Sequence, residues 1–214
     1  MRLLDLFCCQ GGAGKGYADA GFQVVGVDLS PQPRYPFEFH QADAIEFVKE
    51  HGHEFDAIHA SPPCQAYTLA QRIQGNEHPD LVANMRGALD VLGKPYVIEN
   101  VPGSPLKNPI ELCGSMFDIH TYRHRLFESN IPLTVPEHAE HTAKTVKMGR
   151  QLREGDFYHA VGNFSGVPYV RADMGVPWMS RNGVSECIPP VYAEYVGRQL
   201  MSVLEINNVK ETNE

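Results

Sequence analysis

The sequence lacks a long apolar run, a signal peptide and a paired-cysteine motif. No apolar stretch approaches the roughly 20 residues that span a membrane, and the chain begins directly with a strand-like pattern at residues 3–7. Its five cysteines are an odd number without a CxxC pair: Cys8, Cys9, Cys64, Cys113 and Cys187. Neither a disulfide framework nor a zinc site is therefore expected, and we expect a cytoplasmic protein with reduced thiols and no membrane partner.

The sequence also lacks an excess of positive charge. The net charge is −8, which argues against unspecific adhesion to nucleic acid. Residues 1–119 carry 8 Lys+Arg and 15 Asp+Glu, residues 182–214 carry 2 and 5, and residues 120–181 carry 8 and 6. A surface that faces nucleic acid is therefore expected within residues 120–181, and an even scatter of charges is the alternative.

Short apolar segments alternate with helical patterns over the first hundred residues. The expected strands are Arg2–Phe7, Gln23–Asp28, Phe37–Gln41, Asp56–Ala60 and Tyr96–Asn100. The expected helices between them are 12–20, 44–51 and 79–92. This alternation predicts an α/β fold with a doubly wound, mostly parallel sheet, in which ligands bind beyond the carboxyl ends of the strands.

The periodic pattern is lost from about residue 130, where prolines and glycines separate short segments. We expect a catalytic and cofactor-binding domain at residues 1–129 and a small irregular insertion at residues 130–183. Residues 184–214 would then return to the first domain through a helix near Val191–Glu205.

The turn after the first strand has the features of a cofactor site. Gly11 and Gly12 let the backbone approach a ligand at the start of a helix, although a purely structural turn is the alternative. Asp28 ends the second strand, where an acid commonly binds ribose hydroxyls. Asp43 follows the third and could instead cap a helix. The GxGxxG spacing of a dinucleotide site is broken at Tyr17, which disfavours an NAD enzyme.

A cysteine and a carboxylate follow two further strands. Cys64 lies on a loop stiffened by Pro62 and Pro63, so it is presented rather than packed, although an inert buried thiol is the alternative. Glu99 ends an apolar run, and burial would raise its pKa and make it a proton donor. A helix cap or a surface ion pair is the alternative for Glu99. Together these residues predict nucleophilic catalysis with a proton donor nearby.

Two arginines and three histidines follow. The segment 122–127 has a strand pattern that places Arg123 and Arg125 on one face. Arginines there could bind a phosphate or carbonyl oxygen, and the alternative is a solvated basic face of an edge strand. His138, His141 and His159 lack a cysteine at ligand spacing, so we expect solvated histidines and no metal site.

The insertion also contains Trp178 and Arg181. These residues could contact DNA or pack the insertion, and the sequence leaves both readings open.

Four of these patterns resemble the DNA (cytosine-5)-methyltransferase family. The family motif DLFxGxGG is matched at residues 5–12, Pro-Pro-Cys-Gln at 62–65, Glu-Asn-Val at 99–101, and the arginines of Gln-x-Arg-x-Arg by Arg123 and Arg125. The resemblance covers about residues 1–130 and the C-terminal helix. It implies the Rossmann-like fold of class I S-adenosylmethionine-dependent methyltransferases.

The resemblance also implies a reaction and a partner. The partner would be double-stranded DNA with a flipped cytosine. Cys64 would attack carbon 6 of the base while Glu99 protonates nitrogen 3. Arg125 would contact the base oxygen, with Arg123 beside it. Carbon 5 would then take the methyl group of S-adenosylmethionine.

For the cofactor, the resemblance implies that Phe7 packs on adenine, Asp28 holds the ribose and Asp43 holds the adenine amine. The cofactor-binding residues implied in full are Asp5, Phe7, Gly11, Gly12, Asp28, Asp43 and Pro63.

The chain departs from the family pattern at several places. Cys9 replaces the first motif glycine, Thr121 replaces the glutamine before the arginines, and the late Gly-Asn-Ser/Ala-Val motif is absent. The recognition region would be short, so specificity could be short, relaxed or shared with a partner subunit. Small enzymes of this kind suggest a prokaryotic or phage-infected cell and restriction–modification. The alternatives are the same chemistry on RNA, an altered cofactor, or a catalytically idle nucleic-acid-binding protein.

Overall fold

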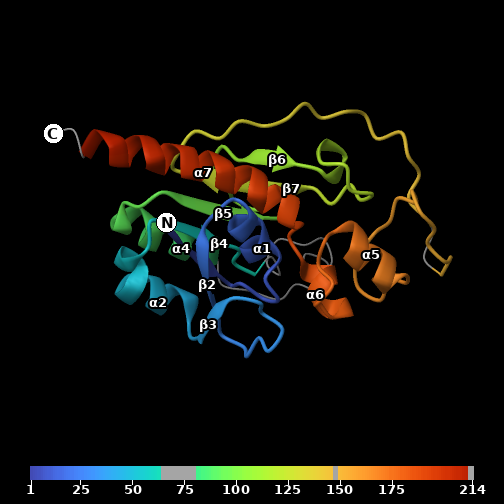
Figure 1. Ribbon diagram of the computed structural model, residues 1–214, viewed down its shortest axis with the longest axis horizontal. Helices are drawn as coiled ribbons and strands as arrows, with labels where there is room; N and C mark the ends of the chain where they lie inside the picture. The colour runs from blue at the N-terminus through green and yellow to red at the C-terminus, as the bar shows by residue number, and fades with distance from the viewer. Residues whose placement is uncertain (64–80, 147–148, 212–214) are drawn as a thin grey trace.

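A computed structural model describes residues 1–63, 81–146 and 149–211 and contains a seven-stranded sheet (Figure 1). The strands are β1 (Arg2–Leu6), β2 (Gln23–Asp28), β3 (Glu38–Gln41), β4 (Ala57–Ala60), β5 (Tyr96–Asn100), β6 (Ile110–Leu112) and β7 (Arg125–Ser129). Their order is β3-β2-β1-β4-β5-β7-β6, and neighbouring strands among β1–β5 are parallel. Strand β7 is antiparallel to both β5 and β6. The prediction of a doubly wound, mostly parallel sheet is confirmed.

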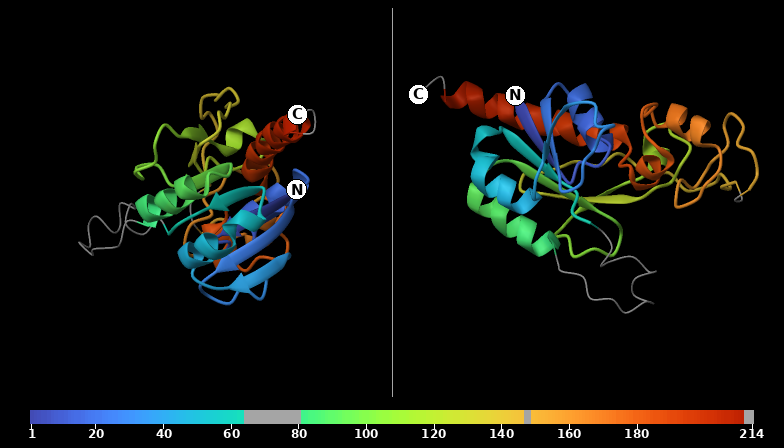
Figure 2. Two further views of the ribbon diagram at one scale, coloured as in Figure 1. Left: turned by 90° about the vertical axis from the view of Figure 1, so that its left-hand side faces the viewer. Right: turned by 90° about the horizontal axis from the view of Figure 1, so that it is seen from below.

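Helices cover both faces of this sheet. They are α1 (Gly12–Asp19), α2 (Ala44–His51), α4 (Leu81–Leu92), α5 (Val167–Asp173), α6 (Arg181–Glu186) and α7 (Pro190–Glu211), with short 3-10 helices η1 (Gly52–Glu54) and η3 (Gly114–Met116). Helices α1 and α7 pack together on one face, and α2 and α4 lie on the other (Figure 2). Within the described residues, no helix combines the length and hydropathy needed to cross a bilayer.

The core follows the two-residue period of the strands. In β1, Leu3 packs in the cluster that contains α1 and α7, whereas Leu4 and Leu6 pack in the cluster that contains α2 and α4. Successive side chains of a strand point to opposite faces, so a sheet covered on both sides needs apolar residues at nearly every position. The apolar runs of the central strands β1, β2, β4 and β5 follow from this burial, whereas the edge strand β3 is mostly exposed.

Glycines let α1 and α7 approach closely. A Cβ atom on Gly16 would lie 2.0 Å from the carbonyl oxygen of Pro190, and one on Gly197 would lie 2.9 Å from Ala20 Cβ. Gly12 is equally constrained, because its Cβ would lie 2.5 Å from Cys187 Sγ. The glycines after β1 therefore have a packing role that the sequence alone did not indicate.

The chain between β7 and α5 is irregular. Residues 130–146 and 149–166 contain no helix or strand. They lead into a third hydrophobic cluster, formed by residues between Tyr158 and Cys187 and including α5 and α6. The expected boundary at residue 183 falls inside α6. This cluster lies beyond the carboxyl ends of the parallel strands, on the right in Figure 1.

Candidate active site

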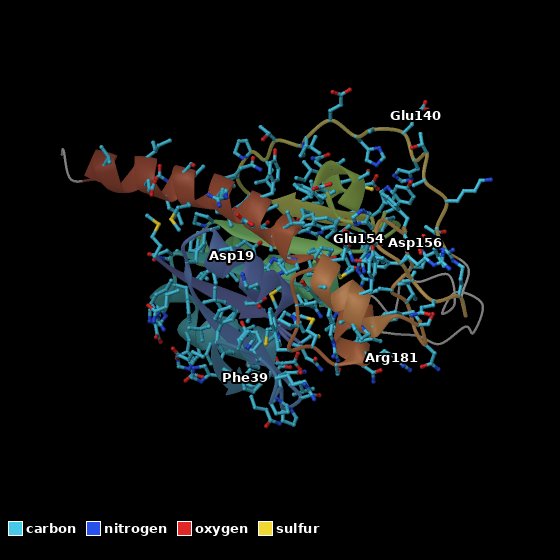
Figure 3. All side chains as sticks on the ribbon, turned by 45° about the vertical axis from the view of Figure 1, so that its right-hand side comes forward. Asp19, Phe39, Glu140, Glu154, Asp156 and Arg181 are labelled. Carbon is cyan, nitrogen blue, oxygen red and sulfur yellow. The ribbon has the colours of Figure 1, made fainter. Side chains whose placement is uncertain are left out.

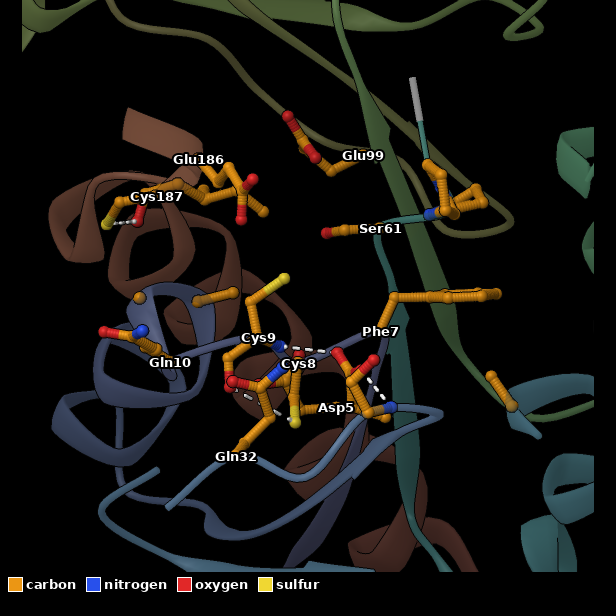
Figure 4. Close-up of a pocket in the computed structure, with 18 of the residues that line it drawn as sticks. Asp5, Phe7, Cys8, Cys9, Gln10, Gln32, Ser61, Glu99, Glu186 and Cys187 are labelled. Carbon is orange, nitrogen blue, oxygen red and sulfur yellow. Dashed lines mark hydrogen bonds between the residues drawn. The ribbon is translucent and has the colours of Figure 1, made fainter. Parts of the chain in front are cut away.

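A cavity of about 580 Å³ opens at the carboxyl ends of β1, β2, β4 and β5 (Figure 4). Eight of the residues expected to function line it: Asp5, Phe7, Gly12, Asp28, Asp43, Pro63, Glu99 and Arg125. Parallel strands bring their carboxyl ends to one edge, which explains why residues far apart in sequence meet there. The expected nucleophile, Cys64, lies outside the described residues.

The turn after β1 is held in a strained conformation. Phe7, Cys9 and Gly11 have φ angles of 59°, 46° and 82°, in the left-handed region that favours glycine. The Cys9 amide donates to Asp28 Oδ2 at 3.0 Å, and the Cys8 amide donates to the Val27 carbonyl at 3.1 Å. These bonds to β2 fix the turn and direct the backbone around the cavity. Gly11 precedes the lining residue Gly12.

The two acids after β2 and β3 are both engaged with backbone amides. Asp28 also accepts from the Ser30 amide through Oδ1 at 2.9 Å. Asp43 is the N-cap of α2, and its Oδ1 accepts from the amides of Ile45 and Glu46 at 2.9 and 3.0 Å. The prediction that Asp43 caps a helix is thus confirmed, and its side chain also borders the cavity.

Asp5 lies in the floor of the cavity and is 1% exposed. Tyr35 donates its hydroxyl to Asp5 Oδ2 at 3.1 Å. Burial raises the pKa of Asp5 from 3.8 to about 7, against the opposing effect of the Tyr35 hydrogen bond, and the charge of Asp28 adds to the rise. Sequence reasoning missed Tyr35, because nothing local marks its contact with β1.

Glu99 lies at the opposite end of the cavity from Asp5 (Figure 4) and is 5% exposed. Arg125 approaches it with Nε 3.1 Å from Oε1. Burial raises the pKa of Glu99, while Arg125, a hydrogen bond from Ser61 and the charge of Arg123 oppose the rise. A buried carboxyl group with a raised pKa and an open side facing a cavity is suited to donating a proton.

A chain of buried polar side chains leads to Glu99. The Tyr17 hydroxyl lies 2.9 Å from His59 Nδ1, and His59 Nε2 lies 2.8 Å from Ser61 Oγ. Burial lowers the pKa of His59 to about 3, so the ring is neutral. A neutral imidazole that accepts at Nδ1 from Tyr17 donates at Nε2 to Ser61, which leaves the Ser61 hydroxyl hydrogen for Glu99. Sequence reasoning missed this chain, and a histidine inside an apolar strand was its one signal.

The loop of Pro62 and Pro63 is tied to β5. Asn100, the residue after Glu99, donates its side-chain amide to the Pro62 carbonyl at 2.9 Å. Its Oδ1 accepts from the Val101 amide at 2.9 Å. The Glu-Asn-Val and Pro-Pro segments are therefore joined directly, and the start of the loop is fixed relative to Glu99.

Arg123 and Arg125 do not share one strand face, so that prediction is wrong. Strand β7 begins at Arg125, and Arg123 precedes it. The Arg123 guanidinium donates instead to the backbone carbonyls of Cys187, Ala160 and Ser185 at 2.7, 2.9 and 2.7 Å. Arg123 thus fastens the third hydrophobic cluster to the sheet, and Arg125 alone lines the cavity.

Trp178 packs against the turn after β1. Its Nε1 donates to the Gln10 carbonyl at 2.8 Å, and its own carbonyl accepts from Arg34 at 2.9 Å. Arg181 begins α6 and is exposed (Figure 3). Packing therefore accounts for Trp178, whereas Arg181 remains available at the surface.

Two histidines of the irregular segment, His138 and His141, lie close to Cys113 and His124. Ligand atoms of Cys113, His124, His138 and His141 lie within 4.8 Å of one another, and His159 does not belong to this group. His138, His141 and His159 are exposed, as expected, but Cys113, which is distant from them in the sequence, reaches His138 and His141 through the fold.

Sequence comparison finds similarity to Type II methyltransferases over about half of the chain. M.AgeI of Thalassovita gelatinovora is 29% identical over 121 residues, which cover 48% of this chain and 28% of that protein. M.AquIA of Picosynechococcus is 27% identical over 121 residues, which cover 48% of this chain and 49% of that protein. The chain thus spans at most about half the length of these curated relatives. No protein-family model matches it.

Comparison with solved structures extends over nearly the whole chain. A protein described as a candidate DNA modification methyltransferase, encoded within an E. coli prophage, superposes with a TM-score of 0.67 at 16% identity and covers 96% of this chain and 99% of its own. The Entamoeba histolytica methyltransferase EhMeth gives a TM-score of 0.62 at 11% identity, covering 95% and 98%. The chain has the Rossmann-like fold of these structures, and over about half of its length its sequence is similar to Type II methyltransferases.

Proposed function

We propose that the protein is a DNA cytosine-5 methyltransferase that transfers a methyl group from S-adenosylmethionine to carbon 5 of cytosine in double-stranded DNA. The observation that carries the proposal is one cavity that is lined both by residues suited to the methyl donor and by residues suited to the base. Phe7 and Asp28 lie at the ends of β1 and β2, and Pro63 and Glu99 lie beyond β4 and β5. A methyl donor and a base held in this cavity would be neighbours.

The residues present fit the cofactor. The cavity volume lies within the range of small-molecule sites. Phe7 offers an aromatic face for adenine, Asp28 an acceptor for ribose hydroxyls and Asp43 an acceptor for the adenine amine. Asp5, Gly11, Gly12 and Pro63 would shape the remainder of the site. When bound, S-adenosylmethionine supplies an electrophilic methyl group.

The protein side chains would prepare the cytosine. The Cys64 thiolate forms a bond to carbon 6 as nitrogen 3 takes the proton of Glu99, which makes carbon 5 nucleophilic. Arg125 contacts the base oxygen. After methylation, carbon 5 loses its proton to water, the bond between sulfur and carbon 6 breaks to release the Cys64 thiolate, and nitrogen 3 returns its proton to Glu99. The hydrogen bond of Asn100 to Pro62 supports this scheme, because it fixes the residues that precede Cys64.

The irregular region is the candidate for target recognition. We assign residues 130–183 to a reduced recognition insertion, between a catalytic domain at 1–129 and a returning segment at 184–214. The support is that residues 120–181 carry 8 Lys+Arg against 6 Asp+Glu, whereas the chain as a whole has a net charge of −8.

The proposal is tested by incubating the purified protein with labelled S-adenosylmethionine and mixed-sequence duplex DNA. The expected product is 5-methylcytosine, identified by mass spectrometry of the nucleosides and mapped at base resolution. Cys64→Ser should abolish the transfer. An N-methylated base, or transfer that survives Cys64→Ser, would overturn the covalent mechanism. Transfer to RNA alone would show that the substrate is RNA. Cofactor binding without any transfer would favour a catalytically idle nucleic-acid-binding protein.

A further inference from the structure

We propose that Cys113, His124, His138 and His141 form a site for one zinc ion, separate from the cavity. Each residue offers one ligand atom, and the four atoms lie within 4.8 Å of one another. None of the four borders the candidate active site as described above. The inference therefore does not depend on the methyl-transfer proposal.

Two distances within the group are close to those around a shared ion. His141 Nε2 lies 3.3 Å from Cys113 Sγ and 3.1 Å from His138 Nε2. Tetrahedral zinc, with bonds of about 2.0–2.1 Å to nitrogen and about 2.3 Å to sulfur, separates its ligand atoms by about 3.3–3.6 Å. A ring nitrogen has a single lone pair or a single hydrogen, so two close partners at one nitrogen are better explained by a common metal than by two hydrogen bonds.

The surroundings hold the ligands in place. Cys113 is fully buried, and its sulfur lies 3.1 Å from Ser115 Oγ, from which a thiolate could accept a hydrogen bond. The Tyr122 ring stacks on His141 with centroids 3.7 Å apart and an interplanar angle of 15°. The Tyr122 hydroxyl donates to the Ala143 carbonyl at 2.9 Å and accepts from the Ala143 amide at 3.0 Å. Groups outside the ligand set thus fix both the sulfur and one imidazole.

The donor set selects the metal. One thiolate and three imidazoles suit zinc, whereas calcium and magnesium require oxygen ligands. The carboxylate of Glu111 lies 3.9 Å from His124 Nε2 and is placed to orient that ring rather than to replace a ligand.

The positions of the ligands indicate what the ion would do. Cys113 follows β6 and caps η3, and His124 immediately precedes β7. His138 and His141 belong to the segment without helix or strand, which follows the β6–β7 edge towards α5 (yellow in Figure 1). Glu140, between these two histidines, lies on the outer rim (Figure 3). Zinc would fasten the irregular segment to the edge of the sheet.

The experiment uses the whole protein, purified without chelator. Metal content is measured by mass spectrometry, and the metal-free protein is then titrated with Co²⁺ and with Zn²⁺ against a chromophoric chelator. We expect one zinc ion per chain. Co²⁺ should give the visible bands of a tetrahedral site and a near-ultraviolet thiolate band that is lost in Cys113→Ser.

Exposed ligands provide variants that should fold. His138→Gln and His141→Gln should each lower zinc affinity about 100-fold or more, since removing even an outer-shell partner costs 10- to 100-fold. His159→Gln, an exposed histidine of the same irregular region, is the matched control and should bind as the unaltered protein does. Absence of stoichiometric zinc binding, an octahedral Co²⁺ spectrum, or equal losses in the control and the ligand variants would overturn the proposal.

Discussion

Arg86–Glu128 and Arg125–Glu99 are two buried ion pairs that each use one residue of β7. In the first, Arg86 Nε and Nη2 lie 2.6 and 2.8 Å from the two oxygens of Glu128, and the Lys107 amide donates to Oε2 at 2.6 Å. In the second, Arg125 Nε lies 3.1 Å from Glu99 Oε1. The residue types are the same, but the Glu128 carboxylate is held on both oxygens by close donors.

The same two residue types serve structure in one pair and are placed for chemistry in the other. The bidentate Arg86–Glu128 pair joins α4 to the sheet and does not border the cavity. Glu99 borders the cavity, and burial raises its pKa. Of the two carboxyl groups, Glu99 borders the cavity and has a raised pKa, so it is the one suited to exchange a proton with a bound base.

Of the substitutions in these two pairs, Glu99→Gln should have the largest effect on activity. In the proposed reaction, the amide has no acidic proton to give to the base, so methyl transfer should fall by about 10²- to 10⁴-fold. The free energy of unfolding should change less than in the Glu128 variant described next. Rates with saturating DNA and cofactor, together with urea unfolding, check both points. An active Glu99→Gln protein would show that Glu99 does not donate the proton.

Glu128→Gln is the matched structural variant. Removing one partner from a buried ion pair typically costs about 3–5 kcal/mol, because the remaining charge loses its compensation. The midpoint of urea unfolding should fall accordingly, while the folded fraction, assayed below its melting temperature, keeps its methyl-transfer rate. Loss of activity without loss of stability would reverse the roles assigned to the two pairs.

Asp5 is a third buried carboxyl group, and it accepts hydrogen bonds from the Tyr35 hydroxyl and the Gly14 backbone amide. The pKa of Asp5 is raised from 3.8 to about 7. Between these two pH values, Asp5 keeps its proton in the folded state and has lost it in the unfolded state. The stabilisation from Asp5 is complete below about pH 4 and lost as the pH rises to about 7, at most about 4 kcal/mol. Asp5→Asn should therefore gain stability relative to the unaltered protein as pH rises. A difference in unfolding free energy that is constant from pH 4 to 7 would contradict this.

Ser61→Ala tests the chain that leads to Glu99. The Ser61 hydrogen bond opposes the raised pKa of Glu99, so its removal should raise that pKa further and move the alkaline limb of the pH–rate profile to higher pH. We expect about a tenfold loss of rate, equivalent to one hydrogen bond. Tyr17→Phe, at the far end of the chain, should act in the same direction but less. An alkaline limb that stays in place in both variants would show that the hydrogen-bonded side chains from Tyr17 to Ser61 have a packing role and do not tune Glu99.

Cys9→Gly should have the smallest effect. Cys9 holds a left-handed φ of 46°, which costs a residue with a side chain about 1–2 kcal/mol and glycine almost nothing. Glycine also has more conformational entropy in the unfolded state, which offsets part of this difference. The free energy of unfolding should therefore rise by up to about 1 kcal/mol. Thermal unfolding measures it. A loss of stability would show that the Cys9 side chain, which points into the cavity (Figure 4), contributes packing.

The positions of the five parallel strands could be predicted because short strand-like segments alternate with helical patterns over the first hundred residues. Strands β6 and β7 could not be delimited, since β6 has three residues and β7 is defined by its antiparallel pairing with β5. Arg123 was misplaced because its partners at Ser185 and Cys187 lie more than sixty residues further on.

The same limit applies to the site. Glu99 and Asp28 could be named because each lies at the carboxyl end of a recognisable strand, whereas the link from Tyr17 to His59 joins a helix to a strand 42 residues away. Cys113 meets His138 and His141 only after β6 has paired with β7. Local patterns identify strand ends, and contacts between distant segments require the fold.

The packing of α7 against α1 has a consequence for synthesis of the chain. The glycine face of α1 is shaped to receive Pro190 and its neighbours, and the large apolar residues beneath it include Tyr17. Until residues 190–200 have left the ribosome, that surface has no partner, so one side of the sheet stays exposed through most of translation. Nascent chains stalled before residue 190 should therefore be bound by chaperones and digested by protease, and chains released after α7 should resist both.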